Sequence, residues 1–201
     1  MAGSPGPTVR VWDVPVRLLH WTLVVAVVLA VLSTWALLPE IGISIGGWHQ
    51  PAGYVTLVVV LLRTVWGFTG GRDSSHRHHS HCSRFSQFMR SPRETWRYLQ
   101  QVRRHAEPRH IGHNPLGGWM VLLLLGCIAG LGLTGWLYTS DRYWGSETVE
   151  DIHVALSWLL LALVGLHVAG VAFTSLRQRE NLVLAMFTGR KAAPRQGDPP
   201  A

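Results

Sequence analysis

Four apolar runs, each close to the length that crosses a lipid bilayer, constrain this chain more than any other feature. They cover residues 18–38, 51–69, 116–138 and 152–174. A helix needs about 20 predominantly apolar residues to span the hydrocarbon core of a bilayer. The first run is too long for the apolar region of a signal peptide and lacks a small-x-small cleavage site, so we expect it to remain as a helix. The sequence therefore predicts an all-α integral membrane protein built as a four-helix bundle.

Positive charge is unevenly distributed between the segments that flank these runs. The middle loop (residues 70–114) contains nine Arg or Lys residues, the C-terminal tail (176–201) contains five, and the N-terminal arm contains two. The short connections, residues 39–50 and 140–151, contain only Arg142 against five acidic residues. Because cytoplasmic segments are enriched in Arg and Lys, we expect the loop and both termini to be cytoplasmic. This distribution accounts for the net charge of +7, and nucleic-acid binding is not expected.

The fourth run carries two histidines among residues that are otherwise almost entirely apolar. His153 and His167 are fourteen residues apart, which is about 21 Å along a helix axis. Fourteen steps of 100° leave the two side chains within roughly 40° of each other, so both face the same side of the helix. In a hydrocarbon core of about 30 Å they lie near opposite edges. One helix thus offers one imidazole in each leaflet.

The expected topology gives each of these histidines a partner at its own depth. His20 is near the cytoplasmic start of the first helix, and His49 is at the outer start of the second. Because the fourth helix returns inward, His153 lies at the outer level and His167 at the inner level. We therefore expect two bis-histidine sites, in which His20 pairs with His167 and His49 pairs with His153.

Paired imidazoles favour haem over zinc as the bound group. A porphyrin supplies four equatorial nitrogens, so its iron needs only two axial ligands from protein, whereas zinc needs three or four. The chain has no C-x-x-C-H motif, so we expect two non-covalent haems b. Two imidazoles close both axial positions, which suits electron transfer. A lone membrane histidine can instead bond to a neighbouring helix, and His113 is a competing ligand, although a role at the entry to the third helix is simpler.

Three further features leave alternatives open. Arg63 follows His49 by fourteen residues, so it either pairs with haem propionates near the inner site or extends to the cytoplasmic surface. The stretch His76–His81 is either a solvated loop or a metal site. Beyond it, Ser91, Pro92 and Glu94 form the start of a helix with a capping box. That segment is either a basic amphipathic helix on the inner membrane face or an ordinary interhelical loop.

Several short motifs, in this order, resemble those of bacterial cytochrome b561, in the superfamily that also contains the b-type cytochrome subunits of nickel-iron hydrogenases. They are "VWDVPVRLLHW", "HQPAGY", "LLRTVWGFTG", "GHNPLGG", the two histidines of the fourth run and "RQRENLVLAMFTGRK". The resemblance covers nearly the whole chain and implies a bacterial inner-membrane protein with a single di-haem domain over residues 1–201. It places His20, His49, His153 and His167 at the axial-ligand positions of the family. The His-rich stretch is a departure from the family pattern.

The resemblance leaves the redox partners open. The first hypothesis is an electron carrier in the lipid bilayer that links quinone or quinol with a c-type cytochrome or an oxidoreductase subunit at the outer face. The alternative is a superoxide:quinone oxidoreductase that acts without a partner protein. The acidic outer connections weigh mildly against the alternative, because a negative surface repels superoxide, and Arg142 is the one basic residue there that offsets it. The third hypothesis is a haem-free membrane scaffold in which the histidines have a structural role. Assembly of the chain as a homodimer is also left open.

Overall fold

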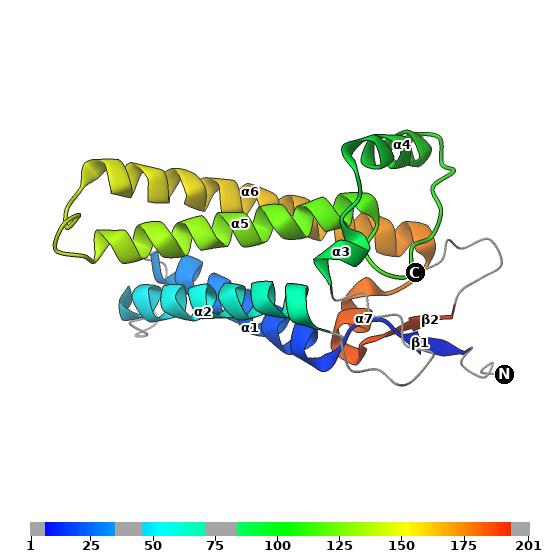
Figure 1. Ribbon diagram of the computed structural model, residues 1–201, viewed down its shortest axis with the longest axis horizontal. Coiled ribbons are helices and arrows are strands. Elements are labelled where there is room, and N and C mark those ends of the chain that lie inside the picture. Colours follow the sequence, from blue (N-terminus) through cyan, green and yellow to red (C-terminus); the bar gives the residue numbers. More distant parts are fainter. Residues whose placement is uncertain (1–6, 35–45, 71–83, 194–201) are drawn as a thin grey trace. The chain divides into compact units, whose positions relative to one another are not determined.

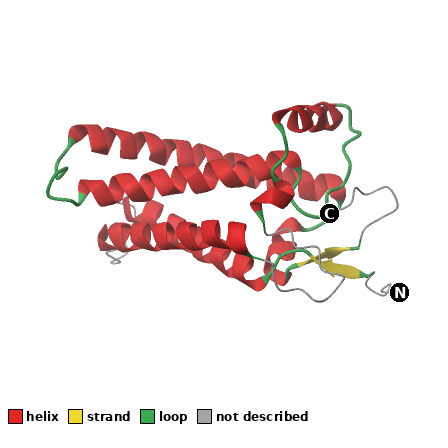
Figure 2. Cartoon of the chain, in the orientation of Figure 1, coloured by secondary structure: helices red, strands yellow, loops and turns green. Residues whose placement is uncertain are grey.

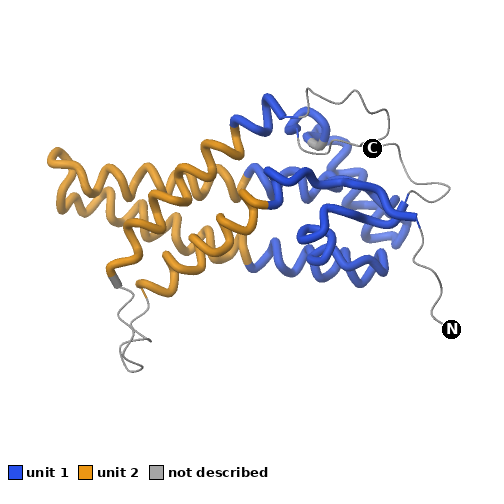
Figure 3. The backbone as a smooth tube through the Cα atoms, turned by 90° about the horizontal axis from the view of Figure 1, so that it is seen from below, with its two compact units in different colours: residues 1–17, 65–122, 165–201 blue, residues 18–64, 123–164 orange. Residues whose placement is uncertain are grey.

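In the part of the chain that the structure describes, most residues are in helices, and two short strands are also present (Figures 1 and 2). The computed structural model describes residues 7–34, 46–70 and 84–193. The chain divides into two compact units (Figure 3). Unit 1 contains residues 1–17, 65–122 and 165–201, and unit 2 contains residues 18–64 and 123–164.

Four long helices confirm the expectation of four candidate membrane spans. They are α1 (Val14–Thr34), α2 (His49–Thr69), α5 (Pro115–Tyr138) and α6 (Glu147–Gln178). Each is long and apolar enough to cross a membrane. The last four residues of the expected first helix, 35–38, lie outside the described residues.

Helix α6 is longer at both ends than the apolar run that predicted it. Its first turn contains Glu147 and Glu150, and its last turn contains Arg177. Acidic side chains stabilise the positive end of the helix dipole and basic side chains stabilise the negative end. The apolar run ends where these polar turns begin, whereas the helix includes them.

The core of unit 2 is formed by residues from all four long helices. Val60 of α2, Cys127 and Ile128 of α5 and Leu160 of α6 are buried together, and Leu23 of α1 packs against them. Other apolar side chains of the same helices face outward, for example Val25, Leu61, Leu133 and Trp158. Lipid tails solvate such surfaces as well as protein does, so a membrane bundle leaves them exposed.

One glycine of α5 permits close contact with α2. A Cβ atom placed on Gly132 would lie 2.9 Å from Leu57 Cδ1 and 3.2 Å from Leu57 Cβ. Small residues at such positions let the backbones of membrane helices approach each other.

In unit 1 the two ends of the described chain are joined. Strand β1 (Thr8–Arg10) pairs antiparallel with β2 (Arg190–Ala192), with Val9 opposite Lys191. Helix α7 (Leu182–Thr188) ends at Gly189, whose φ of 76° is in the left-handed region that glycine adopts without strain. The Gly189 carbonyl accepts a hydrogen bond of 2.8 Å from the Val11 amide. Val11, Trp12 and Ile111 form the buried core beside this pair.

The loop between α2 and α5 contains two helices, α3 (Phe85–Phe88) and α4 (Pro92–Arg103). The predicted capping box of α4 is confirmed. The Ser91 hydroxyl accepts a bond from the Glu94 amide at 3.3 Å, and the Glu94 carboxylate accepts one from the Ser91 amide at 3.0 Å. Pro92 occupies the start of the helix as expected. The His-rich stretch His76–His81 lies outside the described residues.

Candidate haem-binding sites

His49 and His153 lie close together in unit 2. His49 is the first residue of α2, which follows the short 3-10 helix η2 (Gly46–Trp48), and His153 is in the second turn of α6. The centroids of the two imidazole rings are 6.1 Å apart, and the ring planes are inclined at 73°. The sequence predicted these two residues as one pair, and the structure brings them together.

This separation can be compared with the space that an iron between two imidazoles requires. Two metal–nitrogen bonds of about 2.0–2.1 Å, and about 1.1 Å from each nitrogen to its ring centre, add to roughly 6.3 Å between ring centres. The observed 6.1 Å is close to this value. Rotation of either ring about the common axis does not change the distance, so the inclination of the planes is compatible with bis-histidine ligation. The separation of the ring centres therefore matches the space that one iron between two imidazoles needs.

The second ring nitrogen of His49 is held by the backbone of α1. His49 Nδ1 lies 3.0 Å from the Ala30 carbonyl oxygen. A carbonyl oxygen only accepts, so Nδ1 must carry the proton. In this tautomer Nε2 has the free lone pair that a metal needs. The Ser33 hydroxyl lies 3.4 Å from the same nitrogen and 2.7 Å from the Ala30 carbonyl.

The corresponding nitrogen of His153 is held by a side chain. His153 Nδ1 lies 2.8 Å from Thr134 Oγ1 on α5. The Thr134 hydroxyl also lies 2.9 Å from the Gly130 carbonyl and 3.2 Å from the Leu131 carbonyl. When the hydroxyl donates its one proton to a carbonyl, its oxygen accepts from His153 Nδ1–H. In that arrangement His153 is in the same tautomer as His49.

A glycine of α5 lies beside the His153 ring. A Cβ atom on Gly135 would lie 3.4 Å from His153 Cε1 and 3.9 Å from His153 Nδ1. A Cβ atom there would be in ordinary van der Waals contact with the imidazole, so the backbone of α5 at Gly135 lies close beside the His153 ring. Among the described residues, His, Cys, Asp and Glu side chains form no cluster of three or more that could hold a metal ion. Haem iron needs only two protein ligands.

The two histidines of the expected inner site lie in different units. His20 is in the part of α1 that belongs to unit 2, and His167 is in the part of α6 that belongs to unit 1. Both side chains are half-buried. The His20 ring lies edge-on to its neighbour Trp21, with centroids 5.2 Å apart. Their pairing stays a prediction.

Arg63 and His113 have clear places in the structure. Arg63, on α2, is buried, with 8% of its surface exposed. Because the Arg63 side chain is buried, a partner inside the protein is favoured over a guanidinium group that extends to the cytoplasmic surface. His113 precedes α5 and packs on Trp12, with ring centroids 4.7 Å apart, beside the buried core of unit 1. A packing role at the entry to α5 accounts for His113.

Sequence reasoning missed Thr134 and the Ala30 carbonyl. Thr134 is a buried polar residue inside an apolar helix, and such a residue needs a hydrogen-bond partner. The sequence shows a hydroxyl within an apolar run, but it does not indicate that the partner is His153, nineteen positions away. Nothing in the sequence pattern marks the Ala30 carbonyl.

The family model for prokaryotic cytochrome b561 matches residues 11–189. Three curated relatives are named "Probable Ni/Fe-hydrogenase B-type cytochrome subunit". The protein from Bradyrhizobium diazoefficiens is 24% identical over 92% of this chain and 86% of its own. The relatives from Azotobacter chroococcum and Azotobacter vinelandii are 26% and 25% identical, each over 90% of this chain and 87% of its own. No solved structure matches the chain significantly.

The match covers most of the chain and agrees with the four apolar helices. Membership implies a b-type haem, whose iron undergoes the one-electron redox change that electron transfer requires. The chain belongs to the prokaryotic cytochrome b561 family and is a multi-pass membrane b-type cytochrome of electron transport.

Proposed function

We propose that this cytochrome transfers electrons across the bacterial inner membrane through two bis-histidine haems b, between the quinone pool and a redox partner at the outer face. The whole chain, residues 1–201, would form one transmembrane di-haem domain. The single observation that carries the proposal is the 6.1 Å separation of the His49 and His153 ring centres.

The outer site would consist of His49 and His153. Each side chain would offer Nε2 to iron while its Nδ1–H is donated, by His49 to Ala30 and by His153 to Thr134. These bonds fix the orientation of both rings before a metal binds, which lowers the cost of ordering the ligands. The iron would supply one-electron chemistry, and the protein would hold the axial ligands and exclude water.

The inner site would consist of His20 and His167, with Arg63 as a partner for haem propionates. His167 follows His153 by fourteen residues in one unbroken helix, which places it about 21 Å along the axis on the same face. A buried guanidinium such as Arg63 suits a carboxylate, because the two groups can form paired charge-assisted hydrogen bonds.

The charge distribution supports cytoplasmic termini and an outward-facing acidic surface. The connection between α5 and α6 has Asp141 exposed, and Glu147 and Glu150 are exposed at the start of α6. A partner with a basic docking face would be attracted to this surface, because complementary charge accelerates encounter.

An oxidoreductase subunit is the partner that the relatives favour. Three relatives that match along most of their length are named as probable nickel-iron hydrogenase cytochrome subunits. We therefore propose that this chain exchanges electrons between quinone and a membrane-bound oxidoreductase or a c-type cytochrome. Lipid would cover the outward faces of the helices.

The first experiment counts haems and assigns them to ligands. We expect the purified protein to show two low-spin b haems per chain in a reduced-minus-oxidised spectrum. Replacing His49 or His153 with Ala should remove one and the same haem, and replacing His20 or His167 should remove the other. Loss of the same haem from His20→Ala and His49→Ala would contradict the pairing, and a colourless protein would contradict the proposal.

A second experiment separates electron transfer with a partner from direct oxidation of superoxide. Proteoliposomes with both haems are given quinol, and haem reduction is followed by absorbance. The same preparation, oxidised and supplied with quinone, is then given superoxide. Haem reduction by quinol, without reduction by superoxide, supports the carrier. Rapid reduction by superoxide that Arg142→Gln slows would support the alternative.

A further inference from the structure

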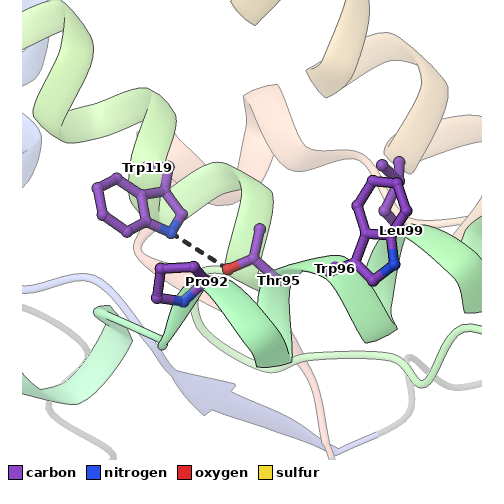
Figure 4. Close-up of a pocket in the computed structure, with 5 residues that line it drawn as sticks. All are labelled: Pro92, Thr95, Trp96, Leu99 and Trp119. Carbon is purple, nitrogen blue, oxygen red and sulfur yellow. Dashed lines mark hydrogen bonds between the residues drawn. The ribbon is translucent and has the colours of Figure 1, made fainter.

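Helix α4 is fixed to the start of α5 by one of its faces. Tyr98 is buried, and its ring lies edge-on to His110 with centroids 5.4 Å apart. Trp119 Nε1 of α5 donates a hydrogen bond of 3.1 Å to Thr95 Oγ1 of α4 (Figure 4). All of these residues belong to unit 1. The remaining faces of α4 therefore have a defined orientation relative to the first turns of a membrane-spanning helix.

An open apolar groove of about 290 Å³ lies between α4 and α5. It is lined by Pro92, Thr95, Trp96 and Leu99 of α4 and by Trp119 of α5 (Figure 4). Pro92, Trp96 and Leu99 follow the i, i+4, i+7 spacing of one helical stripe. Trp96 is 57% exposed and Trp119 is 38% exposed. A soluble protein rarely leaves two tryptophans exposed in one groove, but tryptophan is enriched at the membrane–water interface.

A row of positive charge lies next to this apolar stripe. Arg93 and Arg97 each follow a residue of the stripe by one position, so each lies about 100° around the helix from it. Both arginines are exposed. The helix contains one acidic residue, Glu94, whose carboxylate is engaged in the capping box. An amphipathic helix with tryptophan on one face and arginine on the adjoining face has the composition of helices that lie at the surface of a membrane.

We infer that the groove between α4 and α5 binds an anionic phospholipid, whose acyl chain lies along Trp96, Leu99 and Trp119 while Arg93 and Arg97 contact the phosphate. Two observations select this occupant. The groove includes Trp119 in the first turns of α5, a candidate membrane span, so it would lie near the level of the lipid headgroups. The adjoining charge is positive, which attracts anionic headgroups. The inference requires a membrane protein but does not depend on the haem ligands.

The test compares two faces of α4 in the full-length protein. Nitroxide labels are placed at Leu99→Cys, in the groove, and at Gln101→Cys, about 160° around the helix, in a Cys82→Ser background. Cys127 is buried and stays in place. The vesicles contain phosphatidylcholine alone or with phosphatidylglycerol. With phosphatidylglycerol we expect the Leu99 label to be relaxed more by oxygen than by a nickel chelate, and the Gln101 label to show the reverse.

The charge requirement is tested with the double substitution Arg93→Gln/Arg97→Gln. It should make the Leu99 label several-fold more accessible to nickel in vesicles with phosphatidylglycerol, and it should have little effect in phosphatidylcholine alone. Arg142→Gln, which removes an exposed arginine elsewhere, should change nothing. The double variant should also retain less phosphatidylglycerol after purification, measured by mass spectrometry.

Two results would overturn the inference. Equal nickel accessibility at Leu99 and Gln101 in both vesicle types would show that the groove faces water. Protection of Leu99 from both oxygen and nickel would show that protein covers it, as in contact with a second copy of the chain.

Discussion

At the scale of the residue, the hydrogen bond at the second ring nitrogen decides how well a histidine can bind metal. His49 and His153 both donate Nδ1–H, but the acceptors differ. The acceptor for His49 is a backbone carbonyl, which no substitution removes, whereas the acceptor for His153 is the Thr134 hydroxyl. Such a bond orients the ring and makes the ligand more basic, which stabilises the oxidised iron. Thr134 is therefore a positioning residue for the proposed outer haem.

Thr134→Val tests this role because valine has a similar shape and no hydroxyl. We expect the midpoint potential of the outer haem to rise by tens of millivolts, since one hydrogen bond is worth about 0.5–1.5 kcal/mol and a tenfold change in a one-electron equilibrium is about 59 mV. The inner haem should keep its potential. Potentiometric titration, followed at the α absorption band of the haems, measures the midpoint potentials of both haems. Thr134→Ser keeps the hydroxyl and should behave like the wild type; equal potentials in all three proteins would exclude the role.

At the scale of the element, unit 1 is held together by ion pairs between the loop that follows α4 and the end of α6. Arg177 contacts Glu107 through Nε at 2.8 Å and through Nη2 at 3.3 Å. Arg109 contacts Glu180 at 2.9 Å, and its side chain is almost fully buried. The hydrogen bond from Arg177 holds the pKa of Glu107 below its usual value. A carboxylate with a lowered folded pKa stabilises the protein above its unfolded pKa and loses that contribution as pH falls through the folded pKa.

Glu107→Gln should therefore destabilise the protein in a pH-dependent way. We expect a loss of about 1 kcal/mol at neutral pH, which is the upper range for a partly exposed ion pair. The difference from the wild type should shrink as the pH falls below roughly 4.3, the ordinary value for a glutamate. Thermal unfolding in detergent across this range measures it. Asp141→Asn, at an exposed position, serves as the control. A difference that stays constant down to the lowest pH would argue against an ionic contribution.

The contact between α2 and α5 gives a second prediction at this scale. Gly132→Val would bring new methyl groups against Leu57, and overpacking of this kind costs about 1–3 kcal/mol. Gly126→Val is the matched control, because a Cβ atom at Gly126 meets nothing within 4 Å. We expect the melting temperature to fall clearly more for Gly132→Val than for Gly126→Val. Equal losses would mean that the change reflects the helix propensity of valine instead of the contact.

At the scale of the whole molecule, the charge of the connecting segments predicts how the protein is oriented in the membrane. Fourteen of the eighteen Arg and Lys residues lie in residues 70–114 and 176–201, and one lies in the connections 39–50 and 140–151. The rule that positive segments stay in the cytoplasm acts on the chain during insertion, before the tertiary structure forms.

Reporter fusions test this orientation. Alkaline phosphatase fused after Ala201 or inserted in residues 71–83 should be inactive, because the enzyme needs the oxidising outer compartment to form its disulfides. The same enzyme inserted after Arg142 should be active, and a fluorescent protein should give the opposite pattern. Activity at the C-terminus would invert the topology and place His49 and His153 at the inner level.

Local patterns in the sequence determined the elements of this protein. The four spans, the capping box of Ser91 and Glu94, and the spacing of His153 and His167 each depend on residues within one segment, where helix geometry and hydropathy act directly. The pairing of His49 with His153 was also predicted from topology and helical rise, and the structure brings the two rings to 6.1 Å from each other.

Only the tertiary structure decided which side chains meet between segments. Thr134 contacts His153, Gly132 meets Leu57, and Trp12 packs on His113, at separations in sequence of 19, 75 and 101 residues. The rotation of each helix about its own axis selects these contacts. A uniformly apolar helix has no distinct polar and apolar faces that would fix its rotation about its axis. Close packing of particular side chains against neighbouring helices must therefore fix it.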